Sequence, residues 1–169
     1  MVRKIKHFLI KAKKSKTGAI IFMGNKYESA DLLMKLYDLR REETMREARN
    51  WFAGFFPNSA EEIMQTIINP ETSAKYRMVV SYWDMAASFV NHGAIDEEMF
   101  NDASAEGVMV FSRIEPFLEE MRQMFNRPKM LTNLETLVMR MPNAKEMLAA
   151  QREMMKKFAQ ARAAMSKEA

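Results

Sequence analysis

The sequence predicts an all-α protein, a compact bundle of five or six helices with a basic N-terminal arm and a C-terminal helix. The composition is that of a globular chain, with 48% hydrophobic and 28% charged residues and only five Gly and five Pro. Apolar residues recur at helical spacing along most of the 169 residues. No stretch alternates apolar and polar residues between turn signals, so we predict no strands.

The predicted bundle is organised around residues 76–92, YRMVVSYWDMAASFVNH. One helical face is apolar and consists of Tyr76, Val79, Val80, Trp83, Ala86, Ala87 and Val90. A second apolar stripe beside it consists of Met78, Tyr82, Met85 and Phe89. The remaining narrow stripe is polar and consists of Arg77, Ser81, Asp84, Ser88 and Asn91. Because this helix is apolar over most of its circumference, we expect it in the middle of the domain.

Before the central helix, the sequence predicts one long helix and one short helix. The long helix runs from about 29 to 52, with Ser29 as its N-cap. Its charged segment, 39–49, alternates in sign, which is typical of a solvated face. Ser59 and Glu62 have capping-box spacing and open a short helix that ends at Asn69–Pro70.

After the central helix, turn and cap signals divide the chain again. The central helix begins at Thr72 or Ser73, and Gly93 is its expected C-terminal glycine. Asp96 is the next expected N-cap. After a weak patch around Gly107, a longer helix runs to about Phe125 with a kink at Pro116, and a shorter helix over 131–141 stops before Pro142. Nothing folds the last segment back obligatorily, so it could pack on the body or project toward a partner.

Charge divides the chain into three parts: a basic arm (1–26), a helical body (27–141) and a C-terminal amphipathic helix (142–169). The arm has eight Lys and Arg and no acid, a charge of +8. The body has 12 basic and 19 acidic residues, a charge of −7, and the C-terminal part has a charge of +3. This asymmetry favours an arm that seeks an anionic surface over a uniformly basic nucleic-acid binder.

The first 18 residues are the predicted docking element. Apolar residues fall on one side of a helix that Gly18 would end, with cations elsewhere. A basic amphipathic helix of this kind lies on an anionic bilayer or docks into a protein groove, and a solvated tail is the alternative. The candidate partner- or anion-binding residues are Arg3, Lys4, Lys6, Phe8, Leu9, Lys11, Lys13, Lys14 and Lys16.

The segment from Tyr82 to about Leu137 resembles a bacterial family of small all-helical proteins that is catalogued as a domain of unknown function. The matching pattern is an aromatic pair followed by an acid, an "HGAID"-like linker and a second helix ending in Arg. The residues that carry it are Tyr82, Trp83, Asp84, Gly93, Ile95, Asp96, Pro116 and Arg122. Other members often have an N-terminal membrane helix, which this chain lacks, and more often have Glu at the acid position. The resemblance implies an all-α fold and no particular activity.

Asp84 is the one acid embedded in the apolar central helix. Because an isolated buried carboxylate costs several kcal/mol, it needs a partner. We expect a buried polar network in which Arg122, or otherwise Arg77, pairs with Asp84. The structural role is favoured over a catalytic one.

Catalytic and metal chemistry find little support in the sequence. The chain has no Cys and two His, and neither His7 nor His92 follows a Glu at the spacing of di-iron bundles. There is no nucleophile elbow and no glycine-rich phosphate loop. We therefore expect no enzyme activity, no metal and no cofactor, with His92 as a helix C-terminal residue.

The sequence thus predicts a non-catalytic interaction or scaffolding subunit of a larger assembly, docked on a protein or an anionic membrane face through residues 1–18, with 143–169 as a second candidate. One alternative is sequence-independent nucleic-acid association. Another is a small-molecule-binding helical bundle, which requires a sizeable cavity with Asp84 or His92 at its wall. No apolar run reaches the roughly 20 residues of a membrane span, so we expect a cytoplasmic protein, peripheral at the membrane if attached to it.

Overall fold

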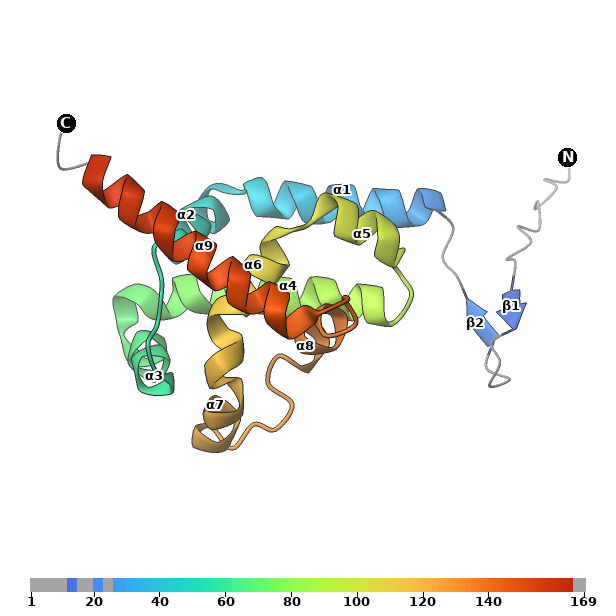
Figure 1. The fold of residues 1–169 in the computed structure, drawn as a ribbon. Coiled ribbons are helices and arrows are strands. Elements are labelled where there is room, and N and C mark those ends of the chain that lie inside the picture. Colours follow the sequence, from blue (N-terminus) through green and yellow to red (C-terminus); the bar gives the residue numbers. More distant parts are fainter. Residues whose placement is uncertain (1–11, 15–19, 23–25, 166–169) are drawn as a thin grey trace, which may run out of the picture.

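The computed structural model describes residues 12–14, 20–22 and 26–165 of the chain (Figure 1). The all-α class is confirmed. The described residues form nine α-helices and one 3-10 helix, more than the five or six predicted. The number is higher because two of the predicted long helices are each divided in the structure.

The predicted helix over 29–52 is two helices, α1 (Lys26–Arg41) and α2 (Glu43–Ala53). Glu42 between them has an extended backbone, and its side chain accepts a hydrogen bond from the Met45 amide, so it caps α2. The prediction of Ser29 as N-cap is wrong. Ser29 lies buried inside α1, where its hydroxyl accepts a hydrogen bond from the Asp96 amide.

The short helix α3 (Ala60–Ile68) begins as predicted. The Ser59 hydroxyl accepts a hydrogen bond from the Glu62 amide at 3.2 Å. Glu62 in turn accepts from the Asn58 amide, one residue before the position that a capping box would use. Asn69 ends α3 and caps the next helix, because its side-chain oxygen accepts a hydrogen bond from the Glu71 amide.

The central helix is α4 (Pro70–Asn91), and its predicted apolar face is confirmed. Its buried residues are Tyr76, Val79, Val80, Trp83, Ala86, Ala87 and Val90. α4 packs against α2, α3, α6 and α8, and Figure 1 shows it crossing the middle of the helical body. The second stripe is less buried than expected, because Met85 and Phe89 are more than a third exposed. α4 ends at His92, followed by Gly93 with a φ of 74°.

Asp96 caps α5 (Glu97–Ala103) as predicted, by accepting a hydrogen bond from the Met99 amide. The helix predicted to kink at Pro116 is divided there into α6 (Glu106–Ile114), the 3-10 helix η1 (Glu115–Phe117) and α7 (Leu118–Met124). The division follows from the proline, which has no amide hydrogen to continue an α-helix.

The last two helices are α8 (Thr132–Val138) and α9 (Ala144–Met165). α8 packs against α4 and α6, and α9 packs against α6. Leu148 in the first half of α9 is fully buried, whereas Phe158 and Met165 in the second half are 60% and 72% exposed. The helix therefore docks through its beginning and extends past the body at its end (Figure 1).

The prediction of no strands is wrong for six residues of the basic arm. β1 (Ala12–Lys14) and β2 (Ile20–Phe22) pair as an antiparallel hairpin, which also contradicts the predicted helix up to Gly18 at residues 12–14. The Ile-Ile-Phe sequence of β2 has high β-propensity, which explains the pairing. The other predicted arm residues, including Arg3, Lys4, Lys6, Phe8, Leu9, Lys11 and Lys16, lie outside the described residues.

Candidate binding groove between α4 and α7

A large hollow of the described surface lies between α4 and α7 and has a volume of about 1250 Å³. We call it the α4–α7 groove. α4, α3, α7 and the α7–α8 loop all contribute to its lining, and most of these residues are apolar. The lining residues are Ile67, Tyr76, Arg77, Val80, Ser81, Asp84, Met85, Met121, Phe125, Arg127, Pro128, Lys129, Met130 and Leu131.

The polar stripe of the central helix faces this groove. Arg77, Ser81 and Asp84 line it from α4, one helical turn apart. Across from them, the α7–α8 loop contributes the exposed side chains of Arg127 and Lys129. The groove thus has an apolar floor and three cations against one carboxylate at its edges.

Asp84 is a cap for a neighbouring helix. Its carboxylate oxygens accept hydrogen bonds from the Leu134 amide at 2.9 Å and from the Asn133 side chain at 3.2 Å. α8 has no cap of its own, because the residue before it, Leu131, adopts a left-handed conformation and makes no side-chain cap bond. The carboxylate therefore satisfies a free amide at the positive end of the α8 dipole.

Arg122 binds the same region from α7. Its guanidinium donates two hydrogen bonds to the Met130 carbonyl and forms an ion pair with Glu135 at 2.6 Å. The described residues contain no ion pair between Asp84 and an arginine, so the predicted Asp84–Arg122 pair is wrong. The two side chains instead hold adjacent parts of one segment, and together they fix the loop that forms a wall of the groove.

Arg77, the second candidate partner, is exposed rather than part of a buried network. Its Nε lies 3.4 Å from the Ser73 carbonyl, one turn back on the same helix. The guanidinium therefore stands at the edge of the groove and is available to a ligand. Burial was the wrong expectation because the polar stripe faces a hollow and not another helix.

Two tyrosines of the central helix differ in the hydrogen bonding of their hydroxyls. The Tyr82 hydroxyl donates a hydrogen bond to the Leu36 carbonyl at 2.7 Å. The Tyr76 hydroxyl has no hydrogen-bond partner among the described residues. Burial raises the pKa of both phenols above the ordinary value. Since both remain protonated at neutral pH, neither is a base for catalysis there.

Most of the chain matches one protein family. Residues 26–141 match the domain of unknown function DUF4760. The chain belongs to this family. No curated protein and no solved structure matches it.

The residues that carry the DUF4760 resemblance have structural roles in this fold. Trp83 and Ile95 are buried, Gly93 ends α4 with positive φ, and Pro116 divides α6 from α7. Asp96 caps α5, and Tyr82 binds the Leu36 carbonyl. Asp84 and Arg122 hold the start of α8. Each of these residues therefore has a part in the architecture that forms the groove.

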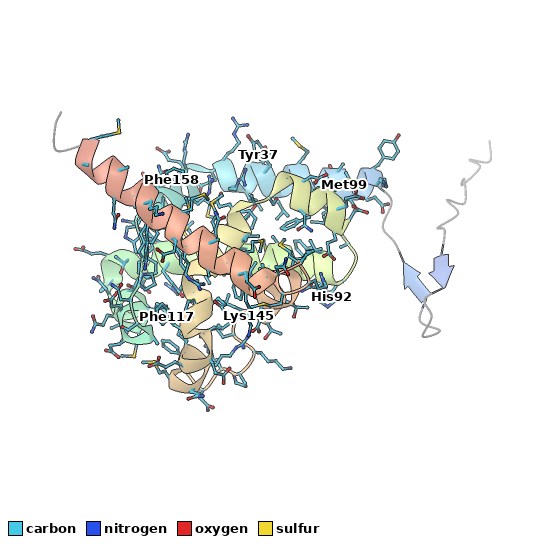
Figure 2. All side chains as sticks on the ribbon, viewed as in Figure 1. Tyr37, His92, Met99, Phe117, Lys145 and Phe158 are labelled. Carbon is cyan, nitrogen blue, oxygen red and sulfur yellow. The ribbon has the colours of Figure 1, made fainter. Side chains whose placement is uncertain are left out.

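The described residues also bear on metal and histidine chemistry. Within the described ranges, no group of three or more His, Asp or Glu side chains is placed to hold a metal ion. The His92 Nδ1 lies 2.7 Å from the Ser88 carbonyl at the end of α4, and His92 does not line the α4–α7 groove. Figure 2 shows it at the edge of the body, at the end of α4. None of the described helices has the length and hydropathy needed to cross a bilayer.

Arg127 and Lys129 are site residues that the sequence analysis missed. They flank Pro128 in a body that otherwise carries excess negative charge. This local concentration of cations beside a proline was the available signal. The pair lies opposite Arg77 because of the way α7 and α8 pack. The residues near positions 127–129 in the sequence do not by themselves determine that packing.

Proposed function

We propose that this protein is a non-catalytic interaction subunit whose α4–α7 groove binds an acidic amphipathic segment of a protein partner. The observation that carries the proposal is the combination of an apolar floor with three cations at the edges, Arg77, Arg127 and Lys129. Apolar contact supplies the affinity of such a groove, and charge selects the partner and its orientation.

The charge of the groove supports an acidic partner because it differs from that of the surrounding body. Residues 27–141 carry a net charge of −7, which repels acidic segments elsewhere on the surface. The single carboxylate of the groove, Asp84, is already engaged with α8. An acidic segment placed in the groove would therefore meet mainly positive charge.

A non-catalytic role is supported by the chemistry of the groove lining. It contains neither histidine nor a pair of carboxylates, and its one tyrosine has a raised pKa. These groups do not form the acid, base and nucleophile constellation that acyl or glycosyl transfer needs. Binding is the function that this set of side chains performs well.

The basic arm adds a second attraction in this proposal. Residues 1–26 carry a charge of +8, so they would attract an acidic protein partner or an anionic membrane face to the N-terminal end of the chain. Arm and groove would act on one assembly. The exposed second half of α9 is a further surface for that assembly.

A photo-crosslinking experiment tests the groove. We would replace Ser81, an exposed groove residue on α4, with p-benzoylphenylalanine in the full chain and crosslink in cells. Mass spectrometry should identify a protein segment with alternating acidic and apolar character. The same replacement at Glu47, an exposed residue that does not line the groove, is the control position.

Charge-reversal variants make the test specific. Arg127→Glu together with Lys129→Glu should reduce the Ser81 crosslink about tenfold, because two attractive charges become repulsive. Lys145→Glu, an exposed cation on α9, should leave the yield unchanged. Equal crosslinking at positions 81 and 47, or products without acidic segments, would reject the groove as the docking site.

Deletion of residues 1–18 tests the arm separately. We expect co-purification with the crosslinked partner, or with anionic liposomes, to be lost or strongly weakened at physiological salt. Undiminished binding would remove the arm from the proposal while leaving the groove intact.

A further inference from the structure

Arg113 on α6 is a buried cation without a buried anion. Its side chain is only 6% exposed, yet no carboxylate of the described residues forms an ion pair with it. A guanidinium in such a position is costly unless its charge and its donors are satisfied. Besides the electrostatic attraction of Glu106, which does not form an ion pair with it, its compensation in the free protein therefore comes from neutral groups.

That compensation is incomplete. The guanidinium donates to the Phe52 carbonyl at the end of α2, approaches the Met155 sulfur at 3.6 Å, and lies 4.4 Å from the centre of the Phe56 ring. The Arg113 Nε is buried and has no acceptor among the described residues. Burial accordingly lowers the pKa of this guanidinium to about 10. The site thus has an unsatisfied preference for negative charge.

A second, smaller pocket opens beside Arg113, between α6, η1 and α9. We call it the α6–α9 pocket; its volume is about 310 Å³. Three cations line it, Arg113 from α6 and Arg152 and Lys156 from α9, and no carboxylate does. The rings of Phe56 and Phe117 form apolar walls, and Figure 2 shows Phe117 on the side of the body away from His92.

The two α9 cations retain free donors. Arg152 binds the Ser112 carbonyl and Glu115 through a single nitrogen, Nη1, at 2.9 and 3.0 Å. Lys156 makes no ion pair within the described part of the chain. An anion in the pocket would therefore find uncommitted donors on α9, in addition to the Arg113 charge on α6.

We propose that the α6–α9 pocket binds a small organic oxyanion, a phosphate or carboxylate group carried on a flat apolar body. The oxyanion group would lie among Arg113, Arg152 and Lys156, and the apolar body between Phe56 and Phe117. The volume suits a molecule of about ten to twenty heavy atoms and excludes a folded segment of protein. Planar guanidinium groups match the geometry of both oxyanions.

Such a ligand would also fasten α9 to the body. Two of the three cations belong to α9, which lies beyond the residues that match DUF4760, and the third belongs to α6 within them. An oxyanion between the two helices adds an attraction where the packing of α9 is thinnest, past Leu148. Binding should therefore reduce hydrogen exchange in the second half of α9.

Titration of the full chain with phenyl phosphate, benzoate and inorganic phosphate, followed by calorimetry and hydrogen exchange, tests the proposal. We expect phenyl phosphate or benzoate to bind with a Kd of about 1 mM or below, and inorganic phosphate about tenfold more weakly because it lacks the ring. Preference between the first two probes identifies the oxyanion class. No saturable binding of either aromatic probe up to about 10 mM would overturn the proposal.

Two charge reversals on α9 separate a built site from general attraction to a basic surface. Lys156→Glu removes a pocket cation and should weaken binding at least about tenfold. Lys157→Glu makes the same charge change on the next residue, which does not line the pocket, and should change the affinity less than about twofold. Equal effects of the two variants would overturn the proposal, as would binding to Lys156→Glu at the affinity of the unaltered chain.

Discussion

At the scale of single residues, the Asp84 carboxylate joins α4 to the start of α8 with two hydrogen bonds. Removing it leaves the Leu134 amide without its acceptor at the positive end of a helix. We expect Asp84→Ala to lower the free energy of unfolding by about 1–3 kcal/mol. Urea denaturation followed by tryptophan fluorescence measures the loss.

Two companion variants interpret this result. Asp84→Asn keeps an acceptor oxygen and should lose less stability than Asp84→Ala. Asp38→Ala removes an exposed carboxylate from α1 and should change stability by less than about 0.5 kcal/mol. If Asp84→Ala resembled Asp38→Ala, the carboxylate would contribute nothing to α8, and the assigned capping role would be wrong.

The Tyr-to-Phe substitution should change the free energy of unfolding in opposite directions at Tyr76 and at Tyr82. Tyr82→Phe removes a hydrogen bond to the Leu36 carbonyl and should lower the free energy of unfolding by about 1 kcal/mol. Tyr76→Phe removes a buried hydroxyl that has no partner among the described residues and should raise it by up to about 1 kcal/mol. Loss of stability in Tyr76→Phe would show that its hydroxyl has a partner.

The same two variants predict a pH dependence. Burial raises the pKa of both phenols in the folded protein, so on alkalinisation the unfolded chain loses these protons first. The stability that the neutral phenols contribute is fully present below a pH of about 10 and is lost as pH rises through the folded pKa values. Each Phe variant should therefore gain stability relative to the unaltered chain between pH 9 and about 11. A difference that stays constant with pH would contradict the raised pKa values.

At the scale of helices, α9 is attached to the body by its first half. Leu148 is fully buried against the core, and Arg152 binds Ser112 and Glu115 one turn later. We expect Leu148→Ala to cost about 2–5 kcal/mol, because it leaves a cavity beneath the helix. Met154→Ala, at a side chain that is 43% exposed, should cost much less.

Hydrogen exchange locates the effect of the Leu148→Ala variant. If the first half of α9 holds the second, the whole helix should exchange faster in Leu148→Ala while α4 remains protected. Uniform loss of protection in all helices would instead mean that α9 unfolds only together with the core.

The same scale shows what the sequence predicted well and where it failed. The buried face of α4 follows from helical periodicity alone, because its seven buried residues recur at helical spacing on one side of the helix. The caps at Ser59 and Asp96 are local and were also predicted. The break at Glu42 was not, since no glycine or proline marks it and its cause is a side-chain acceptor for Met45.

The candidate-site residues show the same difference. Features that depend on local sequence were predicted, and features that depend on the packing of distant helices were not. The polar stripe with Arg77 and Asp84 is visible in the sequence and does line the α4–α7 groove. The partners of Asp84 are on α8, about 50 residues away, and a single sequence does not specify which helix packs there. Arg113 was missed because it appears as one polar residue within an apolar helix pattern, and its burial depends on α2 and α9.

At the scale of the whole molecule, fold and charge reside in different parts of the chain. In the described part of the chain, the core is one cluster of buried apolar residues that runs from α1 to α9, from Leu36 to Leu148. The strongest charge lies before it, in residues 1–26. Figure 1 shows the β1–β2 hairpin beyond the start of α1, apart from the helices. Stability and electrostatic attraction should therefore be separable by truncation.

Removing residues 1–25 is the variant that tests this separation. Because every core residue among those whose burial the structure describes is kept, the free energy of unfolding should stay within about 0.5 kcal/mol of that of the full chain, measured by urea denaturation. The affinity for anionic vesicles or for the crosslinked partner should fall, and most of its salt dependence should disappear with the +7 charge of residues 1–25. A full-length variant with Lys4, Lys6, Lys11, Lys13 and Lys14 changed to Gln should reproduce the binding loss with the arm still present. A large drop in stability on truncation would instead mean that the arm belongs to the folded body, and its charge could then no longer be treated as an independent docking element.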